Sequence, residues 1–220
     1  APGTGRGPSW RTRGASVAGI GCSSRQDRNP SLIAVGAGAL GAGRSVAGRL
    51  LEEMPVQDDP VRARPYFIGG TPNDHASARR IDAFRSVVAE QGEVRPEQIV
   101  ANGYAPALAR AEVAGLLDRL GGMPAALFIN SLTVFEGVLS HFITLPPDAF
   151  ARSVIGCYDY DPFAAFLQFP VHMIRQNSAG LVAKAFELIE TGARDPQMIE
   201  IEPELIAPRT IYSSPFSAFG

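Results

Sequence analysis

Residues 153–176, SVIGCYDYDPFAAFLQFPVHMIRQ, decide the fold class of this chain. The apolar run Val154–Tyr158 predicts a buried strand, and a second strand, Val171–Arg175, follows a short helical turn and a proline. In α/β proteins ligands bind at the carboxyl ends of such strands, which is where Asp159 lies. Tyrosines flank this aspartate on both sides, and a carboxylate beside aromatic surface suits the hydroxyl groups of a sugar.

Apolar segments alternate with amphipathic segments from Ser31 up to this stretch. The predicted strands are Leu32–Val35, Tyr66–Ile68, Gln98–Ala101, Ala125–Ile129 and Val154–Tyr158. The predicted helices between them are Arg44–Glu53, Ala76–Gln91, Pro106–Leu120 and Leu132–Phe142. Alternation of this kind predicts an α/β fold with a parallel sheet that helices cover on both faces.

The chain beyond Gln176 has a different pattern. Asn177 or Ser178 can cap a helix that runs to Thr191, where a glycine follows. Two short strands are predicted after it, Met198–Ile201 and Leu205–Ile211. The polar pair Arg175–Gln176 directly follows a strand, so we interpret it as a crossing between two lobes.

Composition excludes several classes of protein. The 220 residues are 45% hydrophobic, with a formal net charge of −2, so there is no general basic surface for nucleic acid. The two cysteines, Cys22 and Cys157, are too few for a disulfide framework and favour a reducing compartment. We find no signal peptide and no apolar run of about 18 residues, so we expect a cytoplasmic protein without a membrane contact.

One glycine motif, Gly36-Ala-Gly38-Ala-Leu-Gly41, matches the dinucleotide-binding pattern G-x-G-x-x-G after a strand. The next predicted strand, Tyr66–Ile68, ends in two glycines, where the pattern requires an acid for the ribose. The match is therefore incomplete. Close packing of a helix on a sheet explains the glycines equally well, and a dinucleotide-binding enzyme is the least favoured hypothesis.

Two loops between a strand and a helix carry polar residues that could line a cleft. In the first, residues 69–77, Arg79 and Arg80 follow at the start of a helix, where backbone N–H groups favour anions. Adjacent helical residues point about 100° apart, so at most one arginine faces the cleft. In the second, Asn130 and Ser131 can either cap the next helix or point into the cleft.

Groups for catalysis are missing from the sequence. His75, His141 and His172 lie far apart and lack the spacing of metal ligands, so we expect no metal and no cofactor. We find no nucleophile elbow, P-loop or zinc-protease motif. The residues therefore favour a binding protein over an enzyme.

These features together resemble a known family. The stretches PYFIGGTPNDHASARRIDAF, AALFINSLTVFEGVL and GCYDYDPFAAFLQFPVHMIRQ are similar to the effector-binding domain of LacI-type transcription regulators. That domain has the fold of type I periplasmic-binding proteins. NSLTVFEGVL and DPFAAFLQFPV resemble the fructose-repressor branch in particular.

The resemblance implies a division of the chain and a set of roles. Residues 1–30 would be irregular, 31–175 the C-terminal lobe, 176–212 a crossover helix and strands in an incomplete N-terminal lobe, and 213–220 a tail. Arg80, Ser131, Asp159 and Gln176 would line a cleft for a sugar or sugar phosphate. The full-length protein would be a homodimer. It would bind DNA through a helix-turn-helix that this chain lacks. A sugar-binding protein for transport has the same fold and is the alternative.

Overall fold

Two β-sheets organise this computed structural model, which describes residues 17–20, 33–192 and 197–209. The larger sheet has six strands in the order β4-β3-β5-β6-β7-β9, and the smaller has three in the order β1-β2-β8. In the larger sheet only β9 is antiparallel to its neighbour. The bounds of its strands are β3 Pro65–Ile68, β4 Ile99–Val100, β5 Ala126–Ile129, β6 Val154–Cys157, β7 Val171–Arg175 and β9 Glu204–Ile206.

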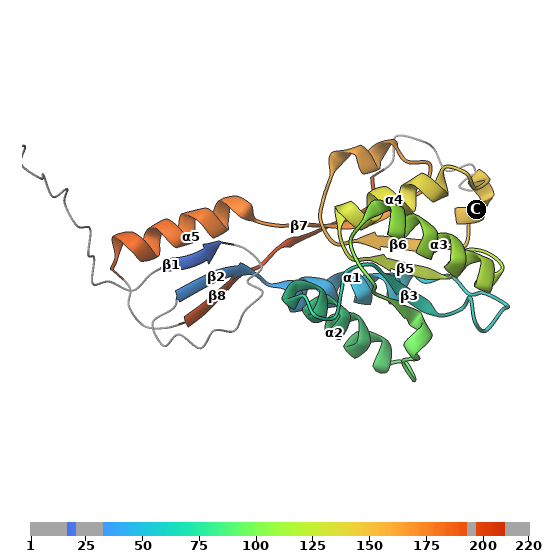
Figure 1. The fold of residues 1–220 in the computed structure, drawn as a ribbon, viewed down its shortest axis with the longest axis horizontal. Coiled ribbons are helices and arrows are strands. Elements are labelled where there is room, and N and C mark those ends of the chain that lie inside the picture. Colours follow the sequence, from blue (N-terminus) through green and yellow to red (C-terminus); the bar gives the residue numbers. More distant parts are fainter. Residues whose placement is uncertain (1–16, 21–32, 193–196, 210–220) are drawn as a thin grey trace, which may run out of the picture.

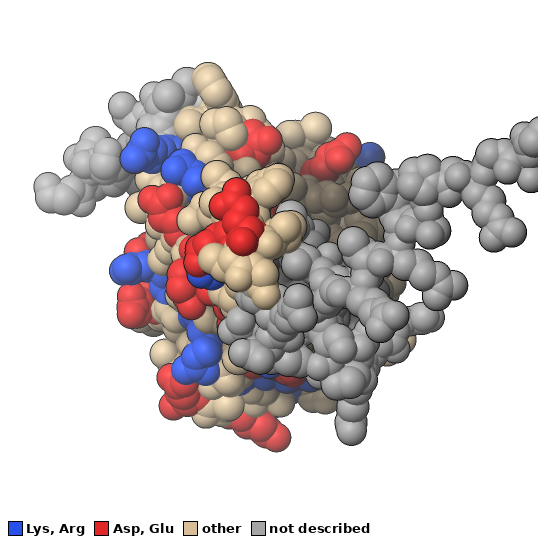
Figure 2. Space-filling view, turned by 90° about the vertical axis from the view of Figure 1, so that its left-hand side faces the viewer, with Lys and Arg blue, Asp and Glu red and all other residues tan. Residues whose placement is uncertain are grey.

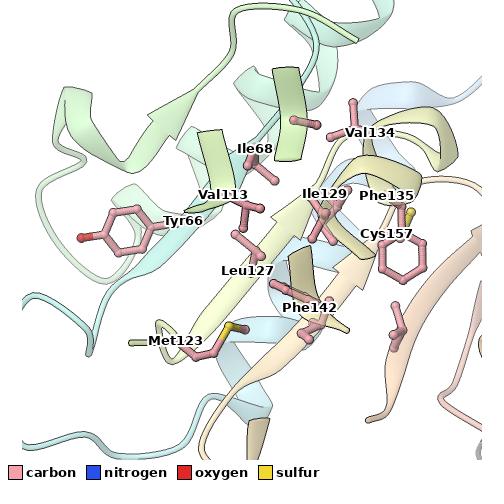
Figure 3. Packing of buried hydrophobic residues seen from close by; sticks show 14 of the residues in the cluster. Tyr66, Ile68, Val113, Met123, Leu127, Ile129, Val134, Phe135, Phe142 and Cys157 are labelled. Carbon is pink, nitrogen blue, oxygen red and sulfur yellow. The ribbon is translucent and has the colours of Figure 1, made fainter. Parts of the chain in front are cut away.

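Helices cover both faces of the larger sheet because its strands are apolar on both faces. Phe67 and Phe128 point to the face covered by α1 (Ala39–Glu53) and α2 (His75–Ala89). The alternate residues Ile68 and Ile129 point to the opposite face, which α3 (Pro106–Leu120) and α4 (Leu132–Phe142) cover. Figure 3 shows this second core, with side chains from β3, β5, α3 and α4 packed together.

Close helix packing completes these layers. Gly43 of α1 lies against α2, so that a Cβ added there would meet the Ala83 Cβ at 2.8 Å. Gly137 of α4 lies against the first residue of α3 in the same way. Three short 3-10 helices, Pro96–Gln98, Pro147–Phe150 and Pro162–Phe166, each begin with a proline and connect helices or strands to β4, β6 and β7.

The smaller sheet forms a second body at the opposite end of the molecule (Figure 1). It consists of β1 (Val17–Ile20), β2 (Ile33–Ala37) and β8 (Gln197–Ile201), which are parallel. The helix α5 (Ser178–Glu190) covers one face, and its buried stripe of Leu181, Ala185 and Leu188 packs on this sheet.

The chain crosses between the two bodies at three places. It passes from β2 to α1 at Gly38, from β7 to α5 at Gln176–Asn177, and from β8 to β9 at Glu202–Pro203. The first and third crossings touch, because the Gly38 N–H donates to the Ile201 carbonyl over 3.3 Å. These three segments therefore link the two bodies across any binding cleft between them.

The predicted α/β fold class, a parallel sheet flanked by helices, is confirmed, and the helices α3 and α4 have the predicted bounds. The predicted division of the chain at residues 31 and 176 would place β2 with the larger sheet and β9 with the smaller one. β2 pairs with β8, and β9 pairs with β7 and ends at Ile206. The segment 1–30 includes β1, and the rest of it, like residues 213–220, lies outside the described residues. The assignment of residue ranges to lobes remains a proposal.

Candidate functional site

Polar side chains gather at the carboxyl ends of β3, β5, β6 and β7, where these neighbouring strands face the second body. The turn after β3 contains Gly69 and Gly70, both with positive φ (90° and 76°), which turn the chain toward α2. Any Cβ at Gly70 would lie 2.2 Å from Ser77 Oγ, so this close approach requires glycine. The turn thereby places the start of α2 over the ends of β5 and β6.

Arg80, in the second turn of α2, is 93% buried at this edge of the sheet. Its Nη1 donates to the Asn130 carbonyl over 2.6 Å, and its guanidinium carbon lies 3.6 Å from the centre of the Tyr158 ring. The neighbouring Arg79 points elsewhere and pairs with Glu200. One of the two arginines thus enters the site, as the 100° offset along a helix requires.

A hydrogen-bonded cluster that the sequence did not predict lies beside Arg80 and shares Asn130 with it. Asp74 Oδ2 accepts from the Ser77 N–H over 2.9 Å and from the Tyr104 hydroxyl over 2.6 Å. The Ser77 hydroxyl contacts Tyr104 and accepts from Asn130 Nδ2 over 3.1 Å. The only signal for this cluster in the sequence was the aspartate that caps α2, because Tyr104 lies in a loop 30 residues away.

The protonation states in this cluster follow from its contacts. Burial raises the pKa of the Asp74 carboxyl, but hydrogen bonds from Tyr104 and Ser77 lower it by more. The pKa of Asp74 therefore lies below its ordinary value. Burial and then the bond to Asp74 raise the pKa of Tyr104. At neutral pH the cluster therefore holds an ionised Asp74 and a neutral phenol.

Asp159 and Gln176 form the other side of the site. Gln176 Nε2 donates to Asp159 Oδ1 over 2.5 Å, which joins the end of β6 to the second crossing. Asp159 has a φ of 97°, an unfavourable conformation for a residue other than glycine. Strain of this kind collects at functional sites, where the surrounding structure maintains it. Next to it, Arg175 lies 4.4 Å from the centre of the Tyr160 ring.

Ser131 has a structural task. It is the N-cap of α4, and its Oγ accepts from the Val134 N–H over 3.4 Å. Asp161, two residues after Asp159, caps the helix Pro162–Phe166 by accepting from the Phe163 N–H. Of the two alternatives for Ser131, the structure therefore supports the cap, and the adjacent Asn130 contacts Arg80 instead.

The structure shows contacts of the predicted site residues Arg80, Asp159 and Gln176, and of the sequence neighbours of Ser131 and Asp159. Arg80 touches Asn130, which precedes Ser131, and it stacks on Tyr158, which precedes Asp159, and Asp159 bonds to Gln176. Arg80 Nε and Asn130 Oδ1 are buried without a hydrogen-bond partner in the described part of the chain. A buried polar atom without a partner is costly, so a hydrogen-bond partner supplied by a ligand would stabilise this cluster.

Two side chains of types that often take part in catalysis, His172 and Cys157, are buried. Nε2 of His172 lies 2.8 Å from Oε2 of Glu53. Burial, followed by the charge of Asp159, raises the pKa of the Cys157 thiol well above its ordinary value. A thiol of this kind is a poor nucleophile. No group of three or more histidines, cysteines or carboxylates that could hold a metal occurs among residues 17–20, 33–192 and 197–209.

The glycine motif at residues 36–41 spans the end of β2 and the start of α1. The start of α1, where a pyrophosphate would bind, faces the carboxylate of Glu202, whose oxygens lie 3.6 Å from a Cβ built on Gly38 or Gly41. A negative side chain of the protein itself thus lies at this helix end. This arrangement favours the packing role of the glycines.

Comparisons with known proteins agree on the fold. No family model matches the sequence. The sucrose operon repressor of Klebsiella pneumoniae is 35% identical over 77 residues, which make up 34% of this chain and 23% of that protein. The crystal structure of the Cra transcriptional dual regulator from Pseudomonas putida in complex with fructose 1-phosphate matches 81% of this chain and 64% of its own, with a TM-score of 0.68 and 23% identity.

Two further solved structures are similar to this chain. The complex of the transcriptional regulator CelR with cellobiose has a TM-score of 0.65 and 18% identity, over 82% of this chain and 54% of that one. A regulatory protein of the LacI family from Chloroflexus aggregans has a TM-score of 0.67 and 18% identity, over 81% and 68%. The chain thus spans less than two thirds of the Cra and CelR structures. The predicted resemblance is confirmed at the level of the fold.

Proposed function

We propose that this chain, which has the fold of the effector-binding domain of LacI-type regulators, senses a small sugar or sugar phosphate for a transcription regulator. The observation that carries the proposal is the buried Arg80, held between Asn130 and Tyr158 at the strand ends with one nitrogen unpartnered. A fixed guanidinium donates to hydroxyl or phosphate oxygens without a large loss of side-chain entropy.

Each predicted site residue then has a role in this proposal. Arg80 donates to ligand oxygens, and Asp159 accepts from ligand hydroxyl groups while Gln176 holds it in place. The aromatic rings beside these groups pack on the apolar faces of a sugar. Ser131 contributes by fixing the start of α4, directly after the Asn130 carbonyl that Arg80 binds.

Ligands of the similar proteins support the chemical class. The Cra structure contains fructose 1-phosphate and the CelR structure contains cellobiose. A ligand between the two bodies would favour a closed arrangement by bending the three crossings at Gly38, Gln176 and Glu202. Closure would shift the population of a regulator between its DNA-binding states.

The proposal extends to partners outside this chain. Acidic and basic side chains are interspersed on the described surface seen in Figure 2, so we assign DNA binding to a separate helix-turn-helix. We propose a homodimer, because two large apolar side chains are exposed: Ile143, directly after α4, is 81% exposed, and Phe166, in the helix Pro162–Phe166, is 64% exposed. None of the described helices is long and apolar enough to cross a membrane. A regulator of this kind would act in the cytoplasm and needs no catalytic group.

Thermal unfolding in the presence of sugars tests the proposal. Fructose, fructose 1-phosphate, sucrose and cellobiose are added at millimolar concentration, and a ligand at about 100 times its Kd stabilises by about 2.7 kcal/mol. Asp159→Ala should abolish the shift, whereas Asp118→Ala, on the exposed end of α3, should leave it unchanged. If the chain and the full-length protein respond to none of these ligands, the proposed function is wrong.

A further inference from the structure

Three glutamates alternate along the third crossing, in the sequence Glu200-Ile-Glu202-Pro-Glu204. They follow the chain from the end of β8 in the smaller sheet to the start of β9 in the larger one. Each of them meets a positive charge or a helix N-terminus that belongs to the larger body. Neither the proposed cleft nor the packing of the two cores uses these contacts.

Glu200 reaches across to α2. Its Oε1 lies 4.0 Å from Nη2 of Arg79, and the two side chains are 44% and 42% exposed. β8 belongs to the smaller sheet and α2 covers the larger one, so this ion pair joins the two bodies. It also explains why the arginine next to Arg80 points away from the candidate site.

Glu202 lies at the N-terminus of α1. No side chain caps this helix at Gly38, and its first turn contains no acidic residue. The Glu202 carboxylate lies close to Gly38 and Gly41 and supplies the negative charge that a helix N-terminus favours. The backbone bond from Gly38 to Ile201 fixes the same two crossings beside it.

Glu204 anchors the far end of the crossing in the larger sheet. Its Oε2 lies 3.3 Å from Nη1 of Arg175, directly across the antiparallel pair of β9 and β7. The same arginine lies over the ring of Tyr160, the residue after Asp159. The crossing is therefore connected to the candidate site through one side chain.

We propose that Glu200, Glu202 and Glu204 form an electrostatic clasp that sets the angle between the two bodies. Each exposed contact changes an equilibrium by only about two- to five-fold, but three contacts on one short segment act together. Removing all three should change the ratio of open to closed arrangements by about ten-fold. A consequence for effector affinity rests on the proposed function, whereas the angle itself does not.

Spin-label distances measured without any sugar test the clasp directly. Labels at Glu190→Cys on α5 and Asp118→Cys on α3, with Cys22→Ser to remove a second thiol, report the separation of the bodies in the 220-residue chain. Cys157 is buried and stays unlabelled. The variant Glu200→Gln, Glu202→Gln, Glu204→Gln should show a shifted or broadened distance distribution. The matched variant Glu52→Gln, Glu93→Gln, Glu136→Gln changes the net charge equally and should keep the parental distribution.

A salt series on the parental labelled chain is the second measurement. Raising the ionic strength from about 0.1 M to about 1 M shortens the screening length from about 10 Å to about 3 Å, so it should broaden the distribution as the triple variant does. If the triple variant fails to fold by circular dichroism, this series decides. If the distance distribution changes in neither experiment, the proposed clasp is wrong, even if sugars bind to the protein. If the distribution changes but no sugar binds, the clasp is supported and only the proposed function is wrong.

Discussion

Replacing Gly137 by alanine should destabilise the fold, because α4 lies directly against the backbone of α3 at this residue. A Cβ built on Gly137 lies 2.1 Å from the carbonyl oxygen of Pro106, which is backbone and cannot rotate away. Ordinary contact begins at 3.4 Å, so the helices must separate by 1.3 Å at this point. Their separation would loosen the core that Val113 and Val138 share.

The magnitude follows from two opposing effects. Overpacking of this size costs up to about 3 kcal/mol. Alanine in a helix interior gains up to about 1 kcal/mol over glycine. The net expectation for Gly137→Ala is a loss of about 2 kcal/mol in the free energy of unfolding.

Urea unfolding followed by circular dichroism measures this difference. The control is Gly48→Ala in α1, where a Cβ meets nothing within 4 Å and where a gain of about 0.5–1 kcal/mol is expected. The two variants make the same chemical change in helices of the same body. If Gly137→Ala is as stable as Gly48→Ala, the close approach of α3 and α4 does not exist in solution.

Two further predictions concern ionisable groups. The pKa of Asp74 is below its unfolded value of 3.8, so its contribution to stability is full above that pH and disappears as the pH falls through the folded pKa. Asp74→Asn should therefore be less stable than the parent at about pH 7, and this difference in stability should be smaller at about pH 3. The midpoints of urea unfolding of both proteins, measured against pH, test this, and parallel curves would contradict it. Because burial and then the charge of Asp159 raise the pKa of Cys157, its thiol should react with a disulfide reagent only after denaturation, measured in a Cys22→Ser background. Fast labelling of the native protein would show that β6 is exposed.

Local patterns predicted most of the elements because strand and helix periodicities are properties of neighbouring residues. β7 has its predicted bounds, and α3 begins at Pro106, whose ring fits the first turn of a helix. The start of α1 was predicted five residues too late, at Arg44, because glycine and alanine at residues 39–43 carry little periodic signal. Pairing between distant strands cannot be read from these patterns, so only the structure shows that β2 pairs with β8.

The candidate site divides in the same way. The sequence placed Asp159 directly after a buried strand and Arg80 near the start of a helix, and the structure has both residues in those positions. The cluster of Asp74, Ser77 and Tyr104 could not be predicted, because a side chain from the loop after β4 completes it. Nor could the sequence choose between the cap and the cleft for Ser131, since both need the same hydroxyl group.

The sequence by itself determined that this chain is an α/β protein with polar residues at strand ends. Short-range physics suffices for that, because apolar periodicity and helix capping act within a few turns. Only the tertiary structure shows that Arg80 lies over the Tyr158 ring and that Arg79 pairs with Glu200. It also brought Gln176 to Asp159 across 17 positions. These contacts depend on how strands and helices pack in space, which separations along the chain do not specify.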